Sequence, residues 1–246
     1  MAHILVVNPN TSTEMTARIE ATATAVAGPN TEITAVCPSR GPESLESFYE
    51  YHLAAVATLE TVAQYRGDVD GVVVACYGDP GLYPLKELLD VPVIGVAEAS
   101  MATATLLGHR FAILVALDRA VAMMENLVQW YGFADRLASI ESTGLSVLEL
   151  ETDATQTMEA LTAAGHRAID RGSAEVFVLG CSGMSGYDTR LTDELGVPVI
   201  DPVESAVTTV EGLVAQNLTQ SHGGLWATPP TKELRGELPG DEFSGD

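Results

Sequence analysis

Short runs of apolar residues alternate along the chain with longer stretches in which apolar residues recur every three or four positions. The short runs are rich in Val, Ile and Leu and lack polar alternation. This pattern is typical of strands buried on both faces of a parallel sheet. We expect strands at 4–7, 32–36, 71–75, 93–96, 112–115, 139–142, 176–179 and 199–200.

Helical periodicity fills the segments between these runs. A regular alternation of strand and helix indicates a doubly wound α/β architecture with parallel sheets. We expect helices at 13–27, 44–65, 84–89, 99–107, 120–130, 153–171, 189–194 and 203–216.

An internal repeat relates residues 70–100 to residues 175–206. Each segment contains an acidic residue, an apolar strand, a cysteine, a Gly-rich turn, the sequence VPVI and a Glu before a helix. The alignment places Cys76 on Cys181. It predicts two pseudo-symmetric lobes of the flavodoxin or Rossmann type, with the active site between them.

The repeat also suggests where the lobes divide. We expect 1–96 together with 205–222 to form the first lobe and 97–204 the second, because the helix after Val203 is expected to pack back on the first lobe. Residues 229–246 are acidic and rich in Pro and Gly, which predicts a flexible tail.

Charge and length narrow the possible partners and location. The 246 residues carry a net charge of −22, which makes nucleic acid and anionic membranes poor partners. The N-terminus lacks the basic and apolar pattern of a secretory signal, and no apolar run approaches the roughly 20 residues that span a bilayer. We expect a cytoplasmic protein that binds a small molecule.

The three cysteines, Cys37, Cys76 and Cys181, are too few and too widely spaced for a disulfide framework or a zinc finger. The five histidines form no metal-binding pattern, so we expect no metal. A free cysteine is commonly a small buried hydrophobe. That interpretation suits Cys37, which has no counterpart in the repeat.

Cys76 and Cys181 differ from Cys37 because each ends a buried strand and precedes a Gly-containing loop. Ligands of doubly wound folds bind at this end of the strands. Loop N–H groups directed at an anion are expected to lower the thiol pKa from about 8.5 towards neutrality. Two facing thiols suit racemisation, in which one removes a proton from a carbon and the other returns a proton to the opposite face.

The sequence NPNTS follows the first strand. One interpretation is a turn with a helix N-cap at Ser12 or Thr13. The other is that the amides of Asn8 and Asn10 bind a substrate with a CO–NH edge, since an amide offers both a donor and an acceptor. The residues alone leave both open.

The segments ILVVNPNTSTEMT, SRGPESLES, ACYGDPGL, GCSGMSG and VPVIDPVESA together resemble the hydantoin racemase/allantoin racemase family of the aspartate/glutamate racemase superfamily. The likeness runs from about residue 3 to residue 226. It implies a two-lobed α/β fold, no cofactor, a homo-oligomer, and a proton shuttle by Cys76 and Cys181 at the α-carbon of a cyclic ureide. The substrate contacts that it implies are Asn8, Asn10, Ser44, Leu45, Tyr77, Gly78, Ser182 and Gly183, with Ser44 and Leu45 closing the pocket.

Three alternatives remain. An acyclic amino-acid racemase would need charge partners for an ammonium and a carboxylate, and no Arg lies near either cysteine motif. A malonate decarboxylase on this scaffold can use one cysteine, so two argue against it. A non-catalytic two-lobed sensor would use both cysteines only for packing. The substituent on the reacting carbon stays open.

Overall fold

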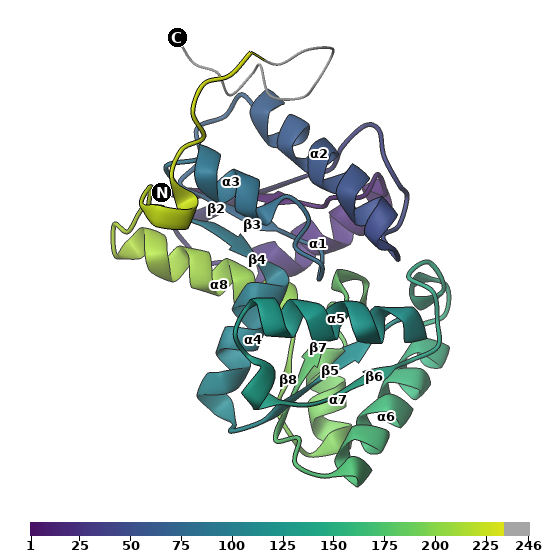
Figure 1. Cartoon of the computed structure of the whole chain (residues 1–246). Coiled ribbons are helices and arrows are strands. Elements are labelled where there is room, and N and C mark those ends of the chain that lie inside the picture. The colour runs from purple at the N-terminus through teal and green to yellow at the C-terminus, as the bar shows by residue number, and fades with distance from the viewer. Residues whose placement is uncertain (234–246) are drawn as a thin grey trace.

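The computed structural model describes residues 1–233, which form two parallel four-stranded sheets (Figure 1). The strand orders, β2-β1-β3-β4 and β6-β5-β7-β8, are the same order used twice. The expected α/β class and all eight expected strands are confirmed. The strands are β1 (Ala2–Val7), β2 (Thr31–Val36), β3 (Gly71–Val74), β4 (Val93–Gly95), β5 (Phe111–Val115), β6 (Leu137–Ser142), β7 (Val176–Leu179) and β8 (Val199–Ile200).

Of the eight α-helices in the described part of the chain, seven connect consecutive strands and the eighth follows β8. The helix predicted from residue 44 in fact begins at Phe48, because the side chain of Ser47 accepts the N–H of Glu50 and caps it there. The helices are α1 (Thr13–Val26), α2 (Phe48–Gln64), α3 (Leu82–Leu88), α4 (Val96–Leu107), α5 (Asp118–Trp130), α6 (Ala154–Arg171), α7 (Asp188–Leu195) and α8 (Pro202–Ala215).

We call the β1–β4 sheet with its covering helices the first lobe, and the β5–β8 sheet with its helices the second. The two lobes exchange one helix each. Helix α4 follows β4 but packs on β5, β7 and β8, whereas α8 follows β8 but packs on α1, β1, β3 and β4 (Figure 1). The two exchanged helices also pack against each other. The numerical lobe boundaries given above stay a prediction.

The core follows from the alternation of side chains along each strand. Ile4 and Val6 pack with α1 and α8, whereas Leu5 and Val7 pack in a cluster with residues of α2 and α3. All four are fully buried. The cluster that holds Ile4 continues into the second lobe through residues such as Leu179. The lobes therefore share one apolar core, which fixes the carboxyl ends of their sheets relative to each other.

None of the helices within residues 1–233 is both long and apolar enough to cross a membrane. Residues 229–233 of the expected tail are exposed. The remainder of that prediction, residues 234–246, lies outside the described residues.

Candidate active site

An enclosed cavity lies where the carboxyl ends of the two sheets meet. Its walls come from the loops after β1 and β3 in the first lobe and from the loops after β5 and β7 in the second. Its volume is about 50 Å³, enough for a few water molecules. Small-molecule pockets usually measure roughly 300 Å³ or more, so this cavity is small for a substrate site.

The predicted catalytic cysteines both line this cavity, one from each lobe. Cys76 follows β3 and Cys181 follows β7. The backbone N–H of Gly78 is directed at the Cys76 sulfur, and those of Gly183 and Met184 at the Cys181 sulfur. Each thiol thus has a donor two residues further along the chain, as the repeat suggests. Cys37 is not among the residues that line this cavity.

The expected lowering of the thiol pKa is wrong. Burial raises the pKa of Cys76 to about 12 and that of Cys181 to about 11. The backbone donors act in the opposite direction but are weaker, and a charge on Cys181 raises the pKa of Cys76 further. The cost of placing a thiolate in an enclosed, largely apolar site outweighs the loop N–H groups. Both thiols are therefore protonated at neutral pH before substrate binds.

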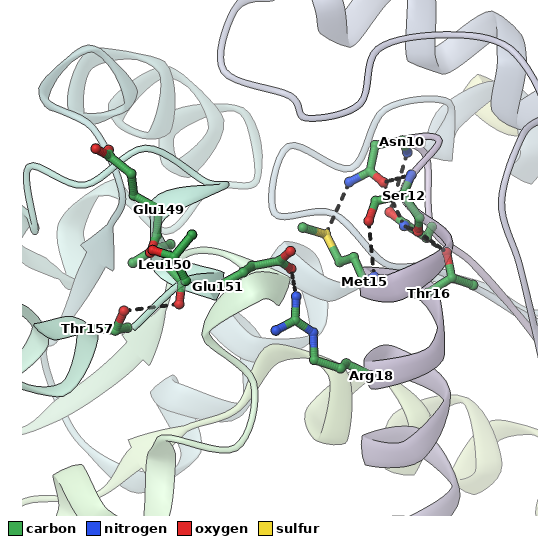
Figure 2. Close-up of polar contacts among 11 residues, drawn as sticks. Asn10, Ser12, Met15, Thr16, Arg18, Glu149, Leu150, Glu151 and Thr157 are labelled. Atoms are coloured by element: carbon green, nitrogen blue, oxygen red, sulfur yellow. Dashed lines mark hydrogen bonds and ion pairs between the residues drawn. The ribbon is translucent and has the colours of Figure 1, made fainter. Parts of the chain in front are cut away.

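The NPNTS segment forms a hydrogen-bonded turn at the cavity wall (Figure 2). Asn8 Nδ2 donates to Asn10 Oδ1 at 2.8 Å and to Thr16 Oγ1 at 3.0 Å. Ser12 caps α1 by accepting the N–H of Met15 at 3.1 Å. Asn10 Nδ2 faces only the Met15 sulfur, at 3.1 Å, which is a weak acceptor. The turn interpretation holds for Ser12, and the Asn10 amide keeps a donor for a ligand.

A loop before α2 covers the cavity and is tied to the second lobe. Leu45 and Glu46 line the cavity from this loop, and Glu46 Oε1 accepts the N–H of Val147 at 3.0 Å. A second tie is the ion pair between Arg18 of α1 and Glu151, which Figure 2 shows near the Asn10 turn. The Glu46–Val147 bond holds the cover loop to the second lobe, and the Arg18–Glu151 pair joins α1 to the same lobe.

Six of the eight predicted contact residues line the cavity: Asn8, Asn10, Leu45, Tyr77, Ser182 and Gly183. Ser44 is half-buried and does not line it, because the chain passes into the cavity wall only at Leu45. Gly78 also lies outside the wall, behind Tyr51, and acts through its N–H on Cys76.

The hydroxyls of Tyr77 and Ser182 are buried and have no hydrogen-bond partner within residues 1–233. A buried unpaired hydroxyl is costly unless water or a ligand satisfies it. Ser182 lies in the cavity wall beside Cys181, so its hydroxyl is available to a bound molecule.

Several lining residues escaped the sequence-based prediction. They come from the cover loop, from the N-terminal halves of the helices after β1, β2 and β5, and from the loop after β6. Apart from Glu46 they are apolar or aromatic side chains, which the sequence does not distinguish from core. Their place in the chain could have identified them, because they follow the carboxyl ends of strands, and ligands of doubly wound folds bind at that edge of the sheet. They include Met15, Glu46, Tyr51, Leu117, Met124 and Val147.

Behind each cysteine loop, a buried carboxylate holds the loop against the N-terminus of the next helix. Asp79 accepts the N–H groups of Ala97 (3.2 Å) and Glu98 (3.0 Å) at the start of α4. Asp201 accepts those of Val203 (2.8 Å) and Glu204 (3.2 Å) at the start of α8. Both carboxylates satisfy free N–H groups at a helix N-terminus.

Within residues 1–233, one cluster of acidic side chains could share a cation. It consists of Asp188, Asp201 and Glu204, whose carboxylate oxygens lie within 4.8 Å of one another. Asp201 is already bonded to Ser185 Oγ and to three backbone N–H groups. Its carboxylate therefore serves as a helix cap.

Comparison with known proteins agrees with this geometry. Residues 4–210 match the family described as Asp/Glu/Hydantoin racemase. The chain is 39% identical to a hydantoin racemase of Pseudomonas sp. (strain NS671) over 236 residues, which cover 96% of this chain and 95% of that protein. It is 40% identical to a hydantoin racemase of Paenarthrobacter aurescens over 232 residues, covering 94% and 98%.

Among solved structures, an allantoin racemase from Klebsiella pneumoniae superposes with a TM-score of 0.93 at 43% identity, covering 97% of this chain and 98% of that one. The family match and these relatives extend over both lobes, including both cysteine loops. The chain belongs to the Asp/Glu/Hydantoin racemase family.

Proposed function

We propose that this protein is a cofactor-independent racemase of cyclic ureides, the five-membered rings of 5-substituted hydantoins and allantoin. The observation that carries the proposal is the pair Cys76 and Cys181, one position of the repeat occurring twice in the wall of one cavity. The relatives described above are named for these two substrate types.

In this proposal one sulfur, as the thiolate, takes the proton from the ring carbon, and the bonding electrons move onto the neighbouring carbonyl oxygen. The other sulfur, as the thiol, returns a proton to the opposite face. The roles exchange for the opposite enantiomer. Because a charge on Cys181 disfavours a charge on Cys76, the pair holds one thiolate and one thiol once a single proton has left.

The charges around the cavity support a neutral substrate. None of the cavity-lining residues, all within the described chain, is Lys, Arg or His, and Glu46 is the one charged group among them. An amino acid or a malonate would bring a carboxylate into this enclosed space without a cationic partner, which is costly. A cyclic ureide brings only amide N–H and C=O groups, which suit Asn10, Ser182 and Glu46.

The direct test is polarimetry at neutral pH on single enantiomers of 5-substituted hydantoins and of allantoin, with deuterium exchange at the ring carbon followed by NMR in D₂O. Loss of optical rotation together with exchange is the expected result. Turnover of glutamate, aspartate or an arylmalonate instead would support the alternatives. Binding of a hydantoin without exchange would indicate a sensor and contradict the proposal.

We also propose that the protein works as a homo-oligomer in the cytoplasm. Phe48 and Tyr49 on α2 and Trp130 on α5 are large apolar side chains that are 52%, 75% and 71% exposed, which is unusual for a free surface. The three cysteines are free thiols, which suits a reducing compartment. Light scattering tests the oligomer, and a monomer at micromolar concentration would contradict it.

A further inference from the structure

Tyr51 lies in the first turn of α2 and lines the cavity together with both cysteines. Its backbone N–H donates to the carbonyl of Ser47, the N-cap residue, at 2.9 Å. Its ring meets that of Phe48 edge-on, with centroids 6.5 Å apart. The side chain is thus built into the wall by helix and ring contacts, although the sequence gives it no motif.

Gly78 fixes the ring of Tyr51 beside the first cysteine loop. A Cβ at residue 78 would lie 2.4 Å from Tyr51 Cε2 and 2.6 Å from Cζ, so the ring occupies the place of a side chain there. The same Gly78 directs its N–H at the Cys76 sulfur. The Tyr51 ring therefore lies against the first cysteine loop at the cavity wall.

The side chain of Tyr51 lines the cavity, where its hydroxyl can donate a hydrogen bond to a bound molecule. Burial raises the pKa of Tyr51 well above its ordinary value, and charges on Cys76 and then Cys181 raise it further. The phenol therefore stays protonated and serves as a donor. Tyr51 and both cysteines line the same cavity, so a substrate ring bound there meets all three side chains.

We propose that Tyr51 is a catalytic residue whose hydroxyl donates a hydrogen bond to the ring carbonyl oxygen next to the reacting carbon. This inference rests on the proposed function. When the thiolate removes the proton, a C–H bond breaks, an S–H bond forms, and the electron pair moves onto that oxygen as an enolate. The Tyr51 donor stabilises the enolate more than the neutral carbonyl. When the second thiol returns a proton, the pair moves back to carbon, and Tyr51 keeps its own proton throughout.

A donor to this oxygen serves both directions of the reaction, because the enolate is common to both enantiomers. The hydroxyls of Tyr77 and Ser182 are also donors in the wall, but each belongs to the loop of a single cysteine. Tyr51 belongs to neither cysteine loop, and charges on both thiols raise its pKa.

The test is Tyr51→Phe, which keeps the ring against Gly78 and removes only the hydroxyl. We expect kcat to fall by roughly 10²–10³-fold with KM changed by less than about threefold, since the lost bond strengthens in the transition state. Deuterium incorporation in D₂O is expected to fall from either starting enantiomer. Thermal melting checks that the variant is folded.

Tyr65→Phe is the matched control, because Tyr65 lies at the C-terminal end of the same helix and does not line the cavity. It is expected to keep wild-type kcat. If the wild type and this control racemise and Tyr51→Phe keeps kcat within about threefold, or changes KM alone, the role of Tyr51 is refuted while the proposed function stands. If the wild type neither racemises nor exchanges any ureide, the proposed function itself fails.

Discussion

In both halves of the repeat a buried aspartate accepts the free backbone N–H groups at the start of the helix after VPVI, but that aspartate lies in a different segment in each half. In the second lobe, Asp201 is the N-cap of its own helix α8, and its other oxygen accepts the N–H of Gly186 from the cysteine loop. In the first lobe the cap position is Gly95, and Asp79 reaches in from the cysteine loop to the same backbone N–H groups of α4.

This difference shows that a repeat can conserve an interaction without conserving its residue. The alignment of VPVIG with VPVID pairs Gly95 with Asp201, whereas Asp79 aligns with Met184. A Cβ on Gly95 would lie 2.3 Å from the Asp79 carboxylate, so the two solutions exclude each other. Asp79 also adopts a φ of 45°, which is uncommon for a residue other than glycine.

The two caps also differ in what they connect. The side-chain donor to Asp201 is Ser185 of its own cysteine loop, whereas Asp79 Oδ2 accepts the hydroxyl of Tyr131, at the end of α5, at 2.6 Å. Burial raises the pKa of Asp79 to about 7, although the Tyr131 bond lowers it. Both caps therefore join a cysteine loop to an exchanged helix, but only the Asp79 cap, within residues 1–233, has an added tyrosine hydroxyl from the α5 region.

The largest expected effect comes from removing either thiol. Cys76→Ser and Cys181→Ser are each expected to reduce racemisation by on the order of 10³-fold or more, because a serine hydroxyl is a far weaker acid and base. Each variant is expected to retain deuterium exchange from one enantiomer only, and the two variants from opposite ones. Cys37→Ser is the control and is expected to be unchanged. Full racemase activity in either variant would contradict the two-base assignment.

The pH profile of activity tests whether the pKa values of the two thiols lie above that of a free cysteine. Since the folded protein holds the pKa values at about 12 and 11, the thiolate fraction grows with pH across the neutral range. We expect kcat/KM to rise roughly tenfold per pH unit between pH 6 and pH 9. A profile that levels off near pH 7 would mean that the pKa values are lowered in the active protein.

Exchanging the caps tests the comparison itself. Gly95→Asp alone is expected to destabilise the fold by about 3 kcal/mol, because it forces a second carboxylate onto Asp79. Combining it with Asp79→Gly recreates the arrangement of the second lobe and is expected to recover all but about 1 kcal/mol. Urea unfolding of the four proteins in this cycle gives the coupling, and simple additivity of the two changes would refute the equivalence of the caps.

The smallest expected effect concerns the bonds that support each cap. Tyr131→Phe removes the donor to Asp79 and is expected to cost about 1 kcal/mol in thermal or urea unfolding. Ser185→Ala removes the counterpart bond to Asp201, which is longer at 3.2 Å, and is expected to cost less. A larger loss for Ser185→Ala would contradict the stronger dependence of the Asp79 cap on its added tyrosine hydroxyl.

Much of this architecture could be predicted from local pattern. Unbroken apolar runs predicted the strands, and the repeat brought Cys76 and Cys181 to one cavity. The equivalence of Asp79 and Asp201 was hidden because it exists only in space. Tyr51 was missed because a tyrosine in a helical pattern looks like core. The direction of the thiol pKa shifts was mispredicted because a motif shows nearby donors but not how completely the fold excludes water.

The enclosure of the two sulfurs also bears on how long the enzyme survives in air. Oxidation to sulfenic acid and disulfide formation both start from a thiolate. Two cysteines that face one cavity would otherwise be at risk of joining to each other or reacting with peroxide. Because burial raises the pKa of both thiols, little thiolate forms at neutral pH, and we expect both reactions to be slow. The same burial that keeps the thiols protonated before substrate binds therefore also protects them from oxidation between turnovers.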